Sequence, residues 1–116
     1  MGETITYDES HKKIIESGIN DIRKVLFGDD IYKIRQLLFC LDLYLDPFYK
    51  NVLPYEKEIY NLLQQLVISS QNDEIIDDCL QLIGDYSCYP LTVMEKGFEG
   101  IKENKKSYAR CVLEQP

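Results

Sequence analysis

The fold of this chain is decided by the stretch Leu37-Leu38-Phe39-Cys40-Leu41-Asp42-Leu43-Tyr44-Leu45, which carries a single charge and places apolar side chains on every side of a helix. A helix of this kind needs packing partners on most of its faces. It is too short to span a bilayer, which takes about 20 apolar residues, and Ile31 and Ile34 precede it at helical spacing. The sequence therefore predicts a central helix over residues 30–45 in a helical protein.

Apolar residues also recur at three- and four-residue steps on both sides of this helix. Upstream, the pattern predicts a helical segment over residues 8–27 that Gly18 can divide in two, with Asp8 or Ser10 as its cap. Downstream, it predicts helices over the ranges 55–70, 73–86, 91–104 and 107–113. The helix over 73–86 is expected to be capped by Asp73.

The number and order of these helices define the predicted fold class. No segment alternates with period two for long, and no Asn-Gly or Asp-Gly hairpin signal occurs, so strands are not expected. A chain of 116 residues is expected to form one domain, residues 1–116. The predicted fold is all-α, with about six antiparallel helices arranged as a compact bundle or as a stack of helix pairs, which share the same local sequence rules.

The longest irregular segment is predicted over residues 46–54. Pro47 and Pro54 disfavour helix at the residues that precede them. The segment also contains Phe48, Tyr49, Val52 and Leu53, which are too apolar for a freely solvated loop. It is therefore expected to fold back over the end of the central helix.

The net charge of −7 and the isoelectric point near 4.6 bear on the class of partner. A net negative charge disfavours binding to nucleic acid and anionic membranes and favours binding to a basic protein. A need for solubility alone would also account for this charge. Residues 1–9 contain neither a basic leader nor an apolar signal core, so a cytoplasmic location is expected.

Signatures of catalysis and of cofactor binding are missing from the sequence. His11 is the single histidine and is expected on the surface, and there is no Gly-x-Ser-x-Gly, Gly-rich phosphate loop or His-Glu-x-x-His motif. The four cysteines form no Cys-x-x-Cys pair, so reduced, buried thiols are expected, with Cys79 or Cys88 the ones to consider for reactivity. We expect no enzyme activity, no cofactor and no small-molecule substrate.

A cluster of carboxylates occupies the start of the helix over 73–86. Ile75 and Ile76 interrupt the alternating oxygen donors that a calcium loop needs, so no metal site is expected there. The cluster instead belongs to an acidic surface with interleaved tyrosines, which give rigid contact area with a polar tip. Tyrosines that cover core edges are the alternative explanation. The residues selected as partner-binding are Asp73, Glu74, Asp77, Asp78, Asp85, Tyr86 and Tyr89.

This helix carries a resemblance to a known family. The segment Asn72–Tyr86, with Leu80 followed by the ending Ile83-Gly84-Asp85-Tyr86, resembles HEAT-type helical-repeat immunity proteins of bacterial toxin–immunity pairs, including those of contact-dependent inhibition. The resemblance covers residues 55–113 and implies HEAT-like helix pairs. It also implies a protein that binds a toxin domain, often a basic nuclease, and occludes it by stoichiometric binding.

Two other functions remain open from the sequence. One is a helical adaptor or regulator that binds a partner peptide in a groove between helices, with the acidic residues serving solubility. The other is a small inhibitor that mimics the charge of nucleic acid. In all three cases the protein acts by binding another protein.

Overall fold

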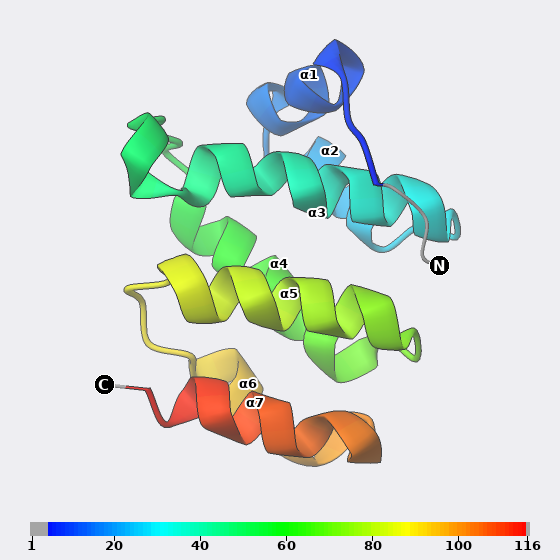
Figure 1. Cartoon of the computed structure of the whole chain (residues 1–116), viewed down its shortest axis with the longest axis vertical. Coiled ribbons are helices and arrows are strands. Elements are labelled where there is room, and N and C mark those ends of the chain that lie inside the picture. The colour runs from blue at the N-terminus through cyan, green and yellow to red at the C-terminus, as the bar shows by residue number, and fades with distance from the viewer. Residues whose placement is uncertain (1–4, 116) are drawn as a thin grey trace. The chain divides into compact units, whose positions relative to one another are not determined.

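A computed structural model describes residues 5–115, which contain seven α-helices, three short 3-10 helices and no strand (Figure 1). The prediction of an all-α fold is confirmed. The contacts divide the chain into two compact units, residues 1–56 and residues 57–116. The expectation that the chain is a single domain stays a prediction.

The first unit is built from three helices, α1 (Glu9–Ser17), α2 (Ile19–Leu26) and α3 (Ile31–Leu45). Each of them packs on the other two. The predicted central helix is therefore present one residue shorter at its start, where the Asp30 carboxylate caps it by accepting a hydrogen bond from the Lys33 amide. Fully buried side chains from all three helices form the core: Ile15, Ile22, Leu26, Leu37 and Leu41.

Gly18 separates α1 from α2. Its backbone angles are φ 124° and ψ 173°, a region that only glycine occupies readily. The break that the sequence allowed at this position is confirmed, and it raises the number of α-helices from about six to seven.

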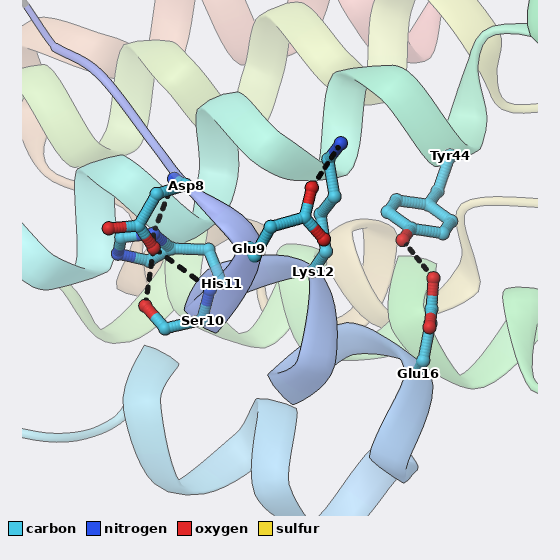
Figure 2. A network of polar contacts seen from close by, with 7 residues as sticks. All are labelled: Asp8, Glu9, Ser10, His11, Lys12, Glu16 and Tyr44. Atoms are coloured by element: carbon cyan, nitrogen blue, oxygen red, sulfur yellow. Dashed lines mark hydrogen bonds and ion pairs between the residues drawn. The ribbon is translucent and has the colours of Figure 1, made fainter.

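The start of α1 corrects the expectation for His11, whose side chain is buried (Figure 2). Nδ1 of His11 accepts a hydrogen bond from the Asp8 amide at 3.1 Å, while the Asp8 carboxylate accepts one from the Ser10 amide at 2.9 Å. The His11 amide also donates to the Asp8 side chain, which completes a capping box in which histidine replaces the usual glutamate or glutamine. The hydrogen bonds from Ser10 lower the pKa of Asp8. His11 is therefore a capping residue at the third position of the helix and does not lie on a solvent-exposed surface.

Two tyrosine hydroxyls form hydrogen bonds within this unit. The Tyr44 hydroxyl of α3 donates to the Glu16 carboxylate of α1 (Figure 2), and the Tyr55 hydroxyl donates to the Ile15 carbonyl. Burial, together with the Glu16 carboxylate, raises the pKa of Tyr44. These tyrosines therefore serve the packing of α1.

The segment between α3 and α4 contains the 3-10 helix η1 (Pro47–Tyr49), capped by Asp46. The Asn51 side chain donates to the Leu43 carbonyl at 3.0 Å, so the segment does turn back to the end of α3. However, Phe48 is 79% exposed and Val52 is 87% exposed. The expectation that their apolar character would cover them is wrong, because the cap and the Asn51 bond fix this short turn without burying either side chain.

The second unit contains four α-helices, α4 (Glu56–Ser69), α5 (Asp73–Tyr86), α6 (Thr92–Lys96) and α7 (Lys106–Leu113). The helix predicted over 91–104 is wrong in its extent, since it ends at Lys96 and is followed by η2 (Phe98–Gly100) and η3 (Glu103–Lys105). Gly97 at the break allows close packing of Ile68, because a Cβ there would lie 2.5 Å from Cδ1 of Ile68 and would displace that side chain.

The bounds of α5 match the prediction, but its cap does not. Oδ1 of Asn72 accepts a hydrogen bond from the Ile75 amide at 3.0 Å, so Asn72 is the N-cap in place of Asp73. Asp73 is consequently the first residue of the helix. Its carboxylate does not cap the helix, so it can bind side chains of other elements.

Two pairs of helices are in contact within this unit, α5 with α7 and α4 with α6. Along α5, Asp77 contacts Lys105 near the start of α7, and Gly84 lies beside Val112 near its end. Along α4, Gln64 contacts Met94 of α6 and Ile68 lies against Gly97. Because both series advance in the same direction, α7 runs parallel to α5 and α6 runs parallel to α4.

Candidate functional site

The predicted partner-binding residues lie on α5 and on the segment that follows it. Helical spacing places the carboxylates in two rows, since residues four apart share a face. The inner row is Asp73 and Asp77, and the outer row is Glu74, Asp78 and Asp85. Together these two rows are the α5 acidic face.

The inner row is paired within the chain. Nζ of Lys102 lies 2.5 Å from Oδ1 of Asp73, and Nζ of Lys105 lies 2.9 Å from Oδ1 of Asp77. Asn104 also donates to Asp73, at 3.3 Å. The hydrogen bonds from Lys102 and Asn104 lower the pKa of Asp73, and the bond to Asp77 raises the pKa of Lys105. These two carboxylates fasten α5 to the segment that leads into α7.

The outer row lies further round the same helix. Glu74 and Asp85 are exposed, whereas Asp78 is half-buried. Asp77, Asp85 and Asp78 lie near Tyr108 of α7, whose pKa is raised chiefly by burial and further by the negative charges of these aspartates. A tyrosine surrounded by carboxylates is thus present at the junction of α5 and α7.

Tyr108 was missing from the selected residues. Its apolar character assigned it to the buried side of the last helix, together with Ala109 and Val112. The structure corrects this, because Ala109 and Val112 are buried while Tyr108 is 39% exposed. Spacing gives no signal that could have found it, because Tyr108 and Val112 are four residues apart and share a helix face.

Tyr86 and Tyr89, the aromatic members of the selected set, are both half-buried. Ser87 orders the segment between them, since its Oγ accepts a hydrogen bond from the Tyr89 amide at 3.3 Å. The ring of Tyr89 lies 5.7 Å from that of buried Tyr60, measured between centroids. The ring of buried Tyr60 and the hydrogen bond to Ser87 therefore fix the position of Tyr89.

Beside Tyr89 lies an open hollow of about 370 Å³, here named the C-terminal hollow because it lies at the C-terminal ends of α5 and α7. It is a concave feature adjoining the selected residues. Its lining residues are Ile83, Ser87, Cys88, Tyr89, Pro90, Leu91, Glu95, Val112, Leu113 and Gln115.

The cysteines fall into two classes. Cys40 and Cys79 are buried, and burial raises the pKa of Cys40 to about 11 and that of Cys79 well above its ordinary value. Cys88 and Cys111 are exposed, so the expectation that all four thiols are buried is wrong for these two. Both lie near the end of a helix, where solvent reaches them.

Residues 5–115 contain no group of three or more His, Cys, Asp or Glu side chains placed to hold a metal ion. In the same range, none of the helices combines the length and the apolar character needed to cross a membrane. Comparison with known proteins gives no further guide to the site: no family model, no curated protein and no solved structure matches this chain.

Proposed function

We propose that this protein is an immunity protein that binds a cognate toxin domain, a basic nuclease in the form we favour, and neutralises it by stoichiometric occlusion. The observation that carries the proposal is the outer row of the α5 acidic face. Glu74, Asp78 and Asp85 lie on one stripe of α5, and Glu74 and Asp85 are exposed there. The outer row thus presents negative charge toward a partner.

Charge complementarity gives this surface its expected role. Carboxylates steer a basic protein to the binding site and form charge-assisted hydrogen bonds with its lysines and arginines. A nuclease uses such cations to hold nucleic-acid phosphates, so a protein that occupies them blocks substrate binding. In this proposal the protein acts by binding in the cytoplasm, without turnover or a cofactor.

Aromatic residues supply the second part of the proposed interface. Tyr108 is partly exposed among the carboxylates, and Tyr89 is held in place by Ser87 and Tyr60. Rigid tyrosines dominate the energetics of many protein interfaces because little conformational entropy is lost when they bind. The interface we propose therefore has tyrosine anchors between carboxylates that select a basic partner.

The proposal is tested by rescue of growth. Each protein domain encoded beside the gene for this chain is expressed in bacteria with the wild-type chain or with the double variant Asp78→Lys and Asp85→Lys. We expect the wild-type chain to restore growth and the double variant to lose most of the protection. Circular dichroism on the purified variant verifies that it is folded.

The matched control is Asp29→Lys, which reverses the charge of an exposed aspartate outside α5. It is expected to protect as well as the wild-type chain does. Equal protection by the double variant would exclude the outer row as the binding surface. Failure of the wild-type chain to protect against any domain encoded beside it would refute the immunity function.

A helical adaptor is the second candidate, and the C-terminal hollow is the observation that favours it. A concave feature lined by Tyr89, Leu91 and Leu113 can receive a side chain of a bound peptide. If that side chain is apolar, binding would depend on the hollow and would change little when salt is raised. An interface centred on the outer row would instead weaken with salt.

A further inference from the structure

We propose that the C-terminal hollow receives a lysine or arginine side chain of the bound partner. The inference rests on the proposed function and specifies it, because it names the chemistry of the partner group and the place where that group is anchored. Three features of the hollow support it: the helix ends that meet there, the side chains that line it and the contacts that hold those side chains.

The first feature is the meeting of two helix C-termini. α5 ends at Tyr86 and α7 ends at Leu113, and residues from both last turns line the hollow. The C-terminus of a helix carries about half a negative charge, which stabilises a nearby cation. Because α5 and α7 are parallel, their two negative ends add at this one place.

The second feature is the charge of the lining side chains. Among the lining residues in the described part of the chain, Glu95 is the one charged side chain, and it is acidic. α5 has no basic residue in its last turn. Arg110 of α7 lies 5.0 Å from the centre of the Phe98 ring and is not part of the lining. The hollow thus combines a carboxylate with two negative helix ends.

The remaining lining groups suit the same ligand. The Tyr89 ring offers a face to a cation, and Ser87 and Gln115 carry oxygen atoms that accept hydrogen bonds. A volume of about 370 Å³ leaves room for a long side chain with several water molecules, since each water takes about 30 Å³ in the liquid.

The third feature is that the hollow is held in shape before any partner binds. Ser87 and the Tyr60 ring fix Tyr89. Gln64 accepts a hydrogen bond from the Met94 amide at 3.0 Å and so fixes the start of α6 one residue before Glu95. Groups positioned in advance cost less to order when they bind.

The test uses the full chain, labelled with ¹⁵N, and the capped peptide acetyl-Arg-Arg-Arg-amide at low salt. We expect saturable NMR shift changes at the amides of Ser87, Cys88, Leu113 and Gln115. Glu95→Gln is expected to weaken the binding about tenfold, as loss of a charge-assisted hydrogen bond does. The control Glu58→Gln removes an exposed carboxylate of α4 outside the hollow and is expected to leave the affinity unchanged.

Shift changes confined to the outer row of the α5 acidic face, or equal affinity for Glu95→Gln and the wild-type chain, would overturn the inference. Its failure is separable from that of the proposed function. If a toxin complex forms and Glu95→Gln leaves its Kd unchanged, the cation site in the C-terminal hollow is refuted, while the proposed immunity function is retained. If no toxin is neutralised but the arginine peptide binds in the hollow and Glu95→Gln weakens it, the cation site is supported without the immunity function.

Discussion

Oε1 of Gln64, buried in α4, accepts a hydrogen bond from the backbone amide of Met94 at 3.0 Å. The first turn of a helix has amide groups without partners in the helix itself, and α6 has no side-chain cap of its own. A glutamine from another helix therefore supplies the cap that α6 lacks. Nε2 of the same side chain donates to the Tyr60 carbonyl at 3.3 Å, so both ends of the amide are used.

The first prediction follows from this contact. Gln64→Leu replaces the polar amide with an apolar group of similar size, and it leaves the buried Met94 amide without its acceptor. We expect a loss of about 1–3 kcal/mol in the free energy of unfolding, measured by urea denaturation. The control Gln65→Leu changes an exposed neighbour and is expected to stay within about 0.5 kcal/mol of wild type. Equal stability of the two variants would contradict the assigned role of Gln64.

A second prediction compares two glycines of the second unit. Gly97→Ala is expected to destabilise by about 1–3 kcal/mol, because its Cβ would lie 2.5 Å from Cδ1 of Ile68 and 3.3 Å from the Val93 carbonyl oxygen. Gly84→Ala is expected to stabilise by about 0.5–1 kcal/mol, because its Cβ would meet Val112 at an ordinary 3.5 Å. Thermal unfolding of both variants checks the opposite signs. Two shifts of the same sign would show that the packing at one glycine is misassigned.

The third prediction concerns acid pH. Lys102 lowers the pKa of Asp73 below its ordinary value of 3.8, so the unfolded chain binds this proton more readily than the folded chain does. The stabilisation from the pair is therefore complete above about pH 4 and is lost as the pH falls through the lower, folded-state pKa. In urea titrations at a series of acid pH values, stability should fall less steeply for Asp73→Asn than for wild type. If the stability of the variant and of the wild-type chain fell equally steeply with pH, Asp73 would not contribute to the loss of stability in acid.

The fourth prediction separates the thiols. Cys88 and Cys111 are exposed, while burial raises the pKa of Cys40 to about 11 and protects Cys79 as well. Since the thiolate is the reactive form, iodoacetamide at neutral pH should modify Cys88 and Cys111 in the folded protein. Mass spectrometry of peptides identifies the sites, and denatured protein should react at all four cysteines. Rapid labelling of Cys40 or Cys79 in the folded chain would contradict their burial.

Much of the helical framework was predictable from local pattern. The bounds of α5 and the break at Gly18 follow from apolar spacing and a glycine, which are properties of neighbouring residues. The role of His11 in a capping box was missed because histidine is not the usual residue there. The exposure of Phe48 was missed because hydrophobicity states what a residue favours and not whether a surface is available to cover it.

The candidate site was predictable only in part, because pairing across the chain has no local signal. The carboxylates of α5 were selected together, yet Asp73 and Asp77 pair with lysines more than 25 residues away in sequence. Tyr108 and the C-terminal hollow likewise depend on α7 lying parallel to α5. The order of helices in the sequence did not specify that arrangement.

The most direct test of the proposed function is calorimetric titration of this chain, at low and at high salt, with each purified protein domain encoded beside its gene. We predict a one-to-one complex whose Kd rises with salt and rises at least about tenfold when Asp78 and Asp85 are changed to lysine, with Asp29→Lys unchanged. A Kd that is insensitive both to salt and to the double variant, or no binding at all, would contradict the account.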